Sequence, residues 1–60
     1  MLSKAFGQRL KATREERGMT QRELARRIET QVPQISRYEN GVYLPNAETL
    51  VQIAGVLKTG

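Results

Sequence analysis

The stretches Thr20-Gln-Arg-Glu-Leu-Ala-Arg-Arg-Ile28 and Gln31-Val-Pro-Gln-Ile-Ser-Arg-Tyr-Glu-Asn-Gly41 decide the fold of this 60-residue chain. Apolar residues recur in both stretches at intervals of three or four, which places them on one face of a helix. They are Leu24, Ala25, Ile28, Ile35 and Tyr38. The sequence therefore predicts two short helices separated by a turn of three or four residues.

The first of these helices has a clear start. Thr20 is a favourable N-cap, and Glu23 follows three residues later, which is the spacing of a capping box. We expect this helix to cover residues 21 to about 28.

The second helix has a less obvious start. A residue before proline avoids helical backbone, but proline itself suits the first turn of a helix. We expect the helix to run from Val32 or Pro33 to Glu39 or Asn40, just before a glycine. Two such helices form a helix-turn-helix over about residues 20–40, and the second helix of this motif can lie in the major groove of DNA.

Two further helices flank the motif. Ser3 is a good N-cap for a first helix that begins at Lys4 and ends at Gly18. Asn46 caps a fourth helix, residues 47 to about 57. The apolar stripe expected on this fourth helix consists of Leu50, Ile53, Ala54 and Leu57. The residues expected in the core are Phe6, Leu10, Leu24, Ile28, Ile35, Leu50, Ile53 and Leu57.

The composition argues against catalysis and metal binding. The chain has no cysteine, histidine or aspartate, so it lacks thiolate and imidazole ligands and the usual general base. Ten Lys and Arg residues against six glutamates give a formal charge of +4, and seven of the ten are arginine, which suits phosphate and guanine. We therefore expect a single domain over residues 1–60 that is not an enzyme, has no cofactor or metal, and has a polyanionic partner.

The hydropathy pattern predicts a protein without a membrane partner. The longest apolar stretches are far too short to cross a bilayer, and no signal peptide opens the chain. These observations predict a cytoplasmic location.

Three motifs at consistent distances carry a resemblance to a known family. They are Thr20-Gln-Arg-Glu-Leu-Ala25, Ile35-Ser-Arg-Tyr-Glu-Asn-Gly41 and Pro45-Asn-Ala-Glu-Thr-Leu50. Over nearly its whole length the chain resembles the lambda-repressor-like helix-turn-helix family, the Cro/C1-type or Xre-type transcriptional regulators. The resemblance implies a compact all-α domain of four or five helices that binds double-stranded DNA, most often as a repressor and as a homodimer on a palindromic operator. It also implies association with the nucleoid of a prokaryote or phage host.

The sequence departs from the family pattern at several positions. Glu29 stands where a glycine is usual in the turn, so the turn either holds a left-handed non-glycine residue, at a cost of about 1 kcal/mol, or has another geometry. Gln31 is a mediocre cap, and Thr30 is the alternative. A fifth helix, which often supplies dimer contacts in the family, would begin near Gly60, so this element is either missing or was removed with a C-terminal region.

The candidate base contacts lie on the second helix of the motif, because such a helix reads bases with its N-terminal residues and its exposed face. Arg37 is the first candidate, since arginine to guanine is the commonest specific contact; the alternative is contact with phosphate or solvent only. Gln34 suits adenine or a phosphate equally. Val32 and Pro33 would touch thymine methyl groups or only shape the helix start. Ser36 completes this set.

The candidate contacts to the DNA backbone are Gln21, Asn40, Arg22 and Tyr43. The resemblance implies that Gln21 contacts the backbone or supports a neighbouring readout residue, and that Asn40 binds a phosphate. As a local alternative, Asn40 is a turn residue before a glycine. Arg26 and Arg27 are expected on a solvated face, because the first helix of the motif lies across the groove rather than in it.

Arg14 and Glu39 match a structural ion pair of the family, which would join the first helix to the end of the third. If the pair is buried, removal of one partner costs about 3–5 kcal/mol, because the other charge is left uncompensated. We expect a role in stability rather than in catalysis.

Two function classes compete with each other. The first is the transcriptional regulator. The second is a protein-interaction module, such as an antitoxin or an adaptor that also binds its own promoter. The surface that would distinguish them is on the C-terminal helix around Val51, Val56 and Leu57, which would hold a protein partner if these side chains are bare.

Overall fold

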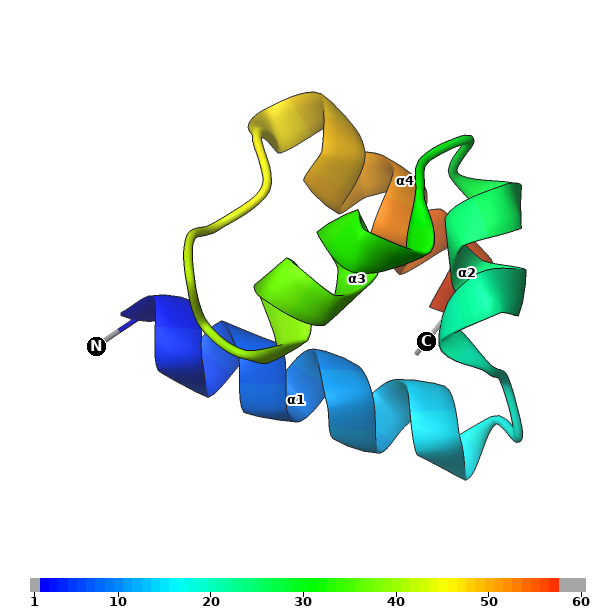
Figure 1. Ribbon diagram of the computed structural model, residues 1–60, viewed down its shortest axis with the longest axis horizontal. Coiled ribbons are helices and arrows are strands. Elements are labelled where there is room, and N and C mark those ends of the chain that lie inside the picture. The colour runs from blue at the N-terminus through cyan, green and yellow to red at the C-terminus, as the bar shows by residue number, and fades with distance from the viewer. Residues whose placement is uncertain (1, 58–60) are drawn as a thin grey trace.

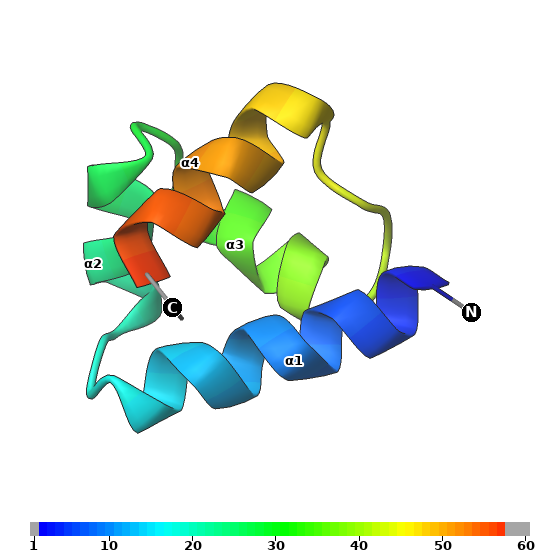
Figure 2. The same ribbon diagram turned by 180° about the vertical axis from the view of Figure 1, so that it is seen from behind.

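The computed structural model describes residues 2–57 and folds them into four α-helices. These are α1 (Leu2–Glu16), α2 (Gln21–Arg27), α3 (Val32–Glu39) and α4 (Ala47–Leu57). In Figure 1, α3 lies at the centre, α1 crosses beneath it, α2 lies at one side and α4 lies behind. Seen from the back in Figure 2, α4 lies in front of α3. The expected all-α fold with a helix-turn-helix in α2 and α3 is confirmed.

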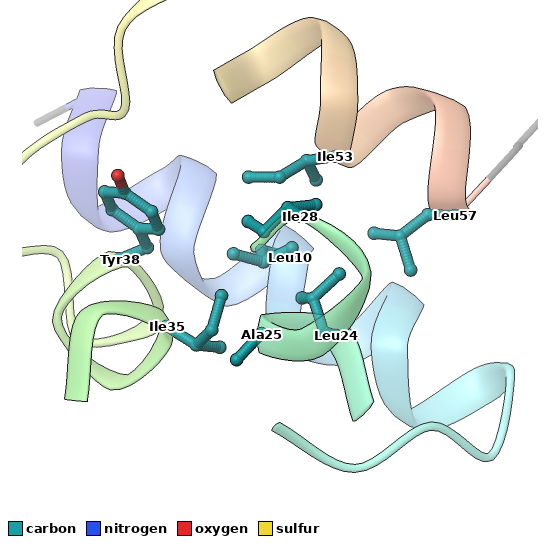
Figure 3. Close-up of a cluster of buried hydrophobic side chains, with 8 residues drawn as sticks. All are labelled: Leu10, Leu24, Ala25, Ile28, Ile35, Tyr38, Ile53 and Leu57. Atoms are coloured by element: carbon teal, nitrogen blue, oxygen red, sulfur yellow. The ribbon is translucent and has the colours of Figure 1, made fainter. Parts of the chain in front are cut away.

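A small apolar core is formed where the four helices meet (Figure 3). Leu24 of α2 and Ile35 of α3 are fully buried, so the two helices of the motif are held together by direct packing. In Figure 3 the Tyr38 ring lies at the edge of this cluster and its hydroxyl points out of it. The buried cluster consists of Leu10, Leu24, Ala25, Ile28, Ile35, Tyr38, Ile53 and Leu57.

The predicted stripe on α4 was partly wrong. Leu50 is 37% exposed and Ala54 is also exposed, whereas Ile53 and Leu57 are buried and Val56 packs against the core. Within the described part of the chain α4 packs mainly against α2, so the side of α4 that faces α1 stays open. Leu50 and Ala54 line the resulting groove.

The predicted start of α1 was also wrong. The helix begins at Leu2, so Ser3 lies within its first turn and does not cap it. Serine is only moderately unfavourable inside a helix, and a cap contributes about 1 kcal/mol. The capping preference of one serine therefore does not fix a helix start.

Side-chain caps begin two of the other helices as predicted. The hydroxyl of Thr20 accepts a hydrogen bond from the backbone N–H of Glu23 at 3.0 Å, and Oδ1 of Asn46 accepts one from the N–H of Thr49 at 2.8 Å. The carboxylate of Glu23 instead lies 3.7 Å from the guanidinium of Arg27. At the start of α3 the N-cap residue is Gln31, not Thr30, and its side chain makes no capping hydrogen bond.

The first three helices end in the same way. In each, the residue after the C-cap has positive φ, at 65° for Gly18, 57° for Glu29 and 75° for Gly41. At each end one backbone N–H donates to the carbonyl three residues earlier, and the next N–H donates to the carbonyl five residues earlier, which is the Schellman pattern. The five-residue bonds run from Met19 to Arg14 at 3.1 Å, from Thr30 to Ala25 at 2.8 Å and from Val42 to Arg37 at 3.0 Å. Of the two turn geometries considered for Glu29, the left-handed one is therefore correct.

Helix α1 approaches the end of α3 very closely at Gly7. A Cβ atom at this position would lie 2.6 Å from the carbonyl oxygen of Glu39 and would also meet that of Tyr38. Only glycine permits this approach, which sets how α3 lies on α1.

Within residues 2–57, none of the helices combines the length and the apolar character that a bilayer crossing requires.

Candidate nucleic-acid interface

Helix α3 has a buried face and an outward face. Ile35, Tyr38 and Glu39 are buried, while Val32, Pro33 and Arg37 are exposed. The remaining two predicted base-contact residues, Gln34 and Ser36, are half-buried between the two faces. The structure therefore brings all five candidates to one helix, with three of them exposed.

Arg37 has an exposed side chain, and none of the other residues from 2 to 57 forms an ion pair or a side-chain hydrogen bond with it. No acceptor among the described residues uses the N–H donors of its guanidinium, so they can bind an external acceptor. Such a group can bind the two acceptors of a guanine edge or the oxygens of a phosphate.

Gln34 is not free in the same way. Its Nε2 donates to the hydroxyl of Tyr38 at 3.0 Å, and its Oε1 accepts a hydrogen bond from the hydroxyl of Tyr43 at 2.9 Å. The two tyrosine rings meet edge to face, with centroids 5.8 Å apart. Tyr43, predicted as a backbone contact, lies beside α3 through its contacts with Gln34 and Tyr38, and it is 41% exposed.

Asn40 and Ser36 are also connected, since Nδ2 of Asn40 lies 3.2 Å from Oγ of Ser36 and donates to it. The side chain of Asn40 is exposed at the end of α3. The hydrogen bond holds this amide against the helix while it remains accessible, so the turn and phosphate-binding interpretations of Asn40 are compatible.

A buried network connects α1, the start of α2 and the end of α3. Nε and Nη2 of Arg14 donate to the two carboxylate oxygens of Glu39 at 2.6 and 3.2 Å, and Nη1 donates to the carbonyl of Met19 at 2.7 Å. Nε2 of Gln21 donates to the same carboxylate at 2.9 Å. The hydrogen bond to Glu39 raises the pKa of the Arg14 guanidinium above its usual value and outweighs the lowering that burial causes. The expected ion pair is present and buried.

Three arginines of α2 line the exposed side of that helix. Arg22 and Arg26 are exposed, and Arg27 is exposed beside Glu23. The solvated face expected for Arg26 and Arg27 agrees with this placement. Gln21, the first residue of α2, directs its amide at Glu39, a member of the buried ion pair, rather than at a candidate readout residue.

An apolar groove of about 560 Å³ lies between α1 and α4, away from these residues. It is lined by Phe6, Leu50 and Ala54 among others, with Arg9 and Glu16 as its charged members.

Across the residues that the structure describes, no three His, Cys, Asp or Glu side chains gather in a way that could hold a metal ion.

Sequence reasoning missed two features of this region. The first is Gly7, because nothing in a lone glycine within a helical pattern indicates a helix crossing. The second is the pair of hydrogen bonds on Gln34. The i, i+4 spacing of Gln34 and Tyr38 could have indicated one of them, but the loop position of Tyr43 carries no such signal.

The chain matches a family of known proteins over the region just described. The helix-turn-helix family HTH_3 matches residues 10–60, which include α2, α3, α4 and the C-terminal part of α1. No curated protein matches the chain significantly. The family match and the exposed face of α3 agree, and the chain therefore belongs to the Cro/C1-type helix-turn-helix family, whose domains bind DNA, typically as parts of transcriptional regulators.

Proposed function

We propose that this protein is a sequence-specific transcriptional repressor that places α3 in the major groove of its operator. The observation that carries the proposal is Arg37, whose guanidinium stands exposed and without a partner among the described residues on the outward face of α3. Arg37 is the main base contact. Bound in this way, the protein excludes RNA polymerase from an overlapping promoter.

The other predicted residues surround Arg37 in a way that supports this role. Val32 and Pro33 are exposed at the N-terminal end of α3, where they meet thymine methyl groups. Arg22 on α2 and Asn40 at the end of α3 are exposed and bind phosphates on either side of the groove. Ser36 takes part through its hydrogen bond with Asn40.

A homodimer is the active form in this proposal. Two recognition helices about 34 Å apart reach successive major grooves, one turn of DNA apart. The exposed apolar side chains of α4 support a contact between copies, since Val51 is 71% exposed and Leu50 is 37% exposed. Fewer side chains of α4 are available for this contact than the sequence predicted, because Leu57 is buried and Val56 packs on the core.

Selection of bound sites from random duplex DNA tests the proposal. A regulator of this kind should return a motif with two inverted half-sites whose centres lie about 10 base pairs apart. The affinity for the selected duplex, measured by fluorescence anisotropy, should fall steeply with salt because phosphate contacts release counterions. Recovery of no motif, or an affinity that salt does not change, would refute sequence-specific binding.

A protein-interaction module is the second candidate, and the bare Val51 is the observation that favours it. In this case α4 binds a different protein, and DNA binding serves only the protein's own promoter. The two candidates differ in their response to substitution. For an interaction module, a pull-down should recover a different protein, which Val51→Glu should release and Arg37→Ala should leave bound, whereas a regulator should recover only a second copy of this chain.

A further inference from the structure

The side-chain amide of Gln34 is held at both ends by tyrosine hydroxyls, an arrangement we call the amide clamp (Gln34, Tyr38 and Tyr43). The Nε2 end donates to Tyr38 at 3.0 Å and the Oε1 end accepts from Tyr43 at 2.9 Å. A glutamine on a helix surface ordinarily rotates among several side-chain conformations. With both ends of its amide bonded, the side chain of Gln34 is held in one conformation.

The clamp joins the core to the loop after α3. Tyr38 is 6% exposed and belongs to the buried cluster, so its hydroxyl has a fixed position. Tyr43 lies in the loop between α3 and α4, where the edge-to-face contact with Tyr38 places its ring and the buried Pro45 anchors the chain two residues later. The second hydroxyl therefore comes from outside the helix-turn-helix itself.

The clamp leaves a defined hydrogen-bonding capacity on Gln34. A primary amide has two N–H donors and two acceptor lone pairs, and each tyrosine uses one of them. One donor and one acceptor remain, which match the N7 acceptor and the N6 donor of adenine in the major groove. Guanine presents two acceptors there, so the fixed amide oxygen would face an acceptor and lose a hydrogen bond.

We propose that Tyr43 is a positioning residue that fixes the amide of Gln34 for adenine at one position of the operator. This inference rests on the proposed function and extends it to a residue that touches no base. Tyr43→Phe tests this directly, since it removes the hydroxyl and keeps the ring that packs on Tyr38.

The experiment begins with the site selected by the wild-type protein. Duplexes carrying each of the four base pairs at every position of one half-site are titrated against wild-type, Gln34→Ala and Tyr43→Phe proteins. We expect one position at which the wild type prefers adenine by roughly 5- to 150-fold, the range of a bidentate base contact. Gln34→Ala should remove the preference there and nowhere else.

Tyr43→Phe should reduce the adenine preference at that same position to a few-fold and leave the preferences at other positions unchanged. In the Gln34→Ala background, Tyr43→Phe should change the preference no further, because the two residues act through one amide. A backbone contact from Tyr43 would instead weaken binding to all duplexes equally, and a purely structural loop residue would change only the melting temperature. Either result overturns the inference, as does an unchanged preference or a preference for guanine.

The free protein gives a second readout that needs no DNA. The side-chain amide signals of Gln34 in a proton–nitrogen NMR spectrum should be distinct from those of exposed glutamines such as Gln52. They should move toward the exposed values in Tyr43→Phe. Signals that do not move would show that the hydroxyl does not hold the amide. If the wild type selects no DNA motif at all, the proposed function fails; if it selects one that Gln34→Ala does not alter, only this inference fails.

Discussion

Nε of Arg14 lies 2.6 Å from Oε2 of Glu39, and both side chains are almost entirely excluded from solvent, at 9% and 3% exposure. The carboxylate also accepts a hydrogen bond from Gln21, and the guanidinium donates to the carbonyl of Met19. The pair therefore connects α1, the turn before α2, the first residue of α2 and the end of α3. It fixes the angle between the two helices of the DNA-binding motif by polar contacts rather than by packing alone.

Glu39→Ala should destabilise the fold severely. The substitution leaves the Arg14 charge buried without its partner and removes the acceptor of Gln21, and loss of one member of such a pair costs about 3–5 kcal/mol. A domain of this size has a total stability of only about 3–9 kcal/mol. We expect a melting temperature lowered by well over 10 °C, or an unfolded protein, in circular dichroism.

Glu23→Ala is the matched control, because Glu23 pairs with Arg27 at 3.7 Å with both side chains about half exposed. Exposed pairs contribute about 0–1 kcal/mol. The control should melt close to the wild type. Equal melting temperatures for the two variants would show that the buried pair does not stabilise this fold.

Gly7→Ala and Gly55→Ala should change stability in opposite directions although both are glycine-to-alanine changes within a helix. At Gly7 the new methyl group meets backbone carbonyls of α3, which cannot rotate away, and overpacking of this kind costs about 1–3 kcal/mol. At Gly55 nothing lies within 4 Å of the new atom, so alanine should stabilise α4 by about 1 kcal/mol. Urea denaturation of both variants measures the difference, and a stabilised Gly7→Ala would contradict the close approach of α1 to α3.

Glu29→Gly should stabilise the protein by about 0.5–1 kcal/mol. Glu29 has φ 57° at the end of α2, where Gly18 and Gly41 occupy the equivalent places after α1 and α3. A left-handed non-glycine residue costs about 1–2 kcal/mol, and glycine removes this cost. Glycine also increases the conformational entropy of the unfolded chain, which offsets part of the stabilisation. The melting temperature should rise by several degrees.

Glu29→Ala separates backbone strain from charge. It removes the carboxylate but keeps a Cβ atom at positive φ, so the strain remains and no gain is expected. A rise in melting temperature that is as large in Glu29→Ala as in Glu29→Gly would assign the effect to the charge instead.

Local signals predicted most of the fold. The caps at Thr20 and Asn46, the glycine stops and the spacing of Leu24, Ile28 and Ile35 depend on neighbouring residues, and all of them are present in the structure. The errors concern features that depend on packing between helices. Leu50 has the right spacing for the core, but no neighbouring helix covers it, and helical periodicity alone does not show which side of α4 its neighbours cover.

The candidate interface was predictable as a set of residues but not as an arrangement. Helical periodicity separates Arg37 from Ile35 and Tyr38, so the outward face of α3 could be identified from the sequence alone. The hydrogen bonds of Gln34 could not, because one of them comes from a loop residue whose position depends on the tertiary fold. The hydrogen bond from the Gln21 amide to Glu39 could not be predicted either, because it also depends on the tertiary fold.

Arg37→Ala should abolish sequence preference at one operator position while leaving the fold unchanged. The side chain is exposed and has no partner within the described residues, so the free energy of unfolding should stay within about 0.5 kcal/mol of the wild-type value. A bidentate contact to guanine contributes about 1–3 kcal/mol of discrimination, so the loss should appear in a titration of operators with each base at that position. Arg26→Ala removes another exposed arginine, on the solvated face of α2, and should leave all preferences intact. If Arg37 instead contacts only a phosphate, its removal will weaken binding to every duplex alike and lower the slope of log affinity against log salt by about 1; that result would rule out Arg37 as a base contact.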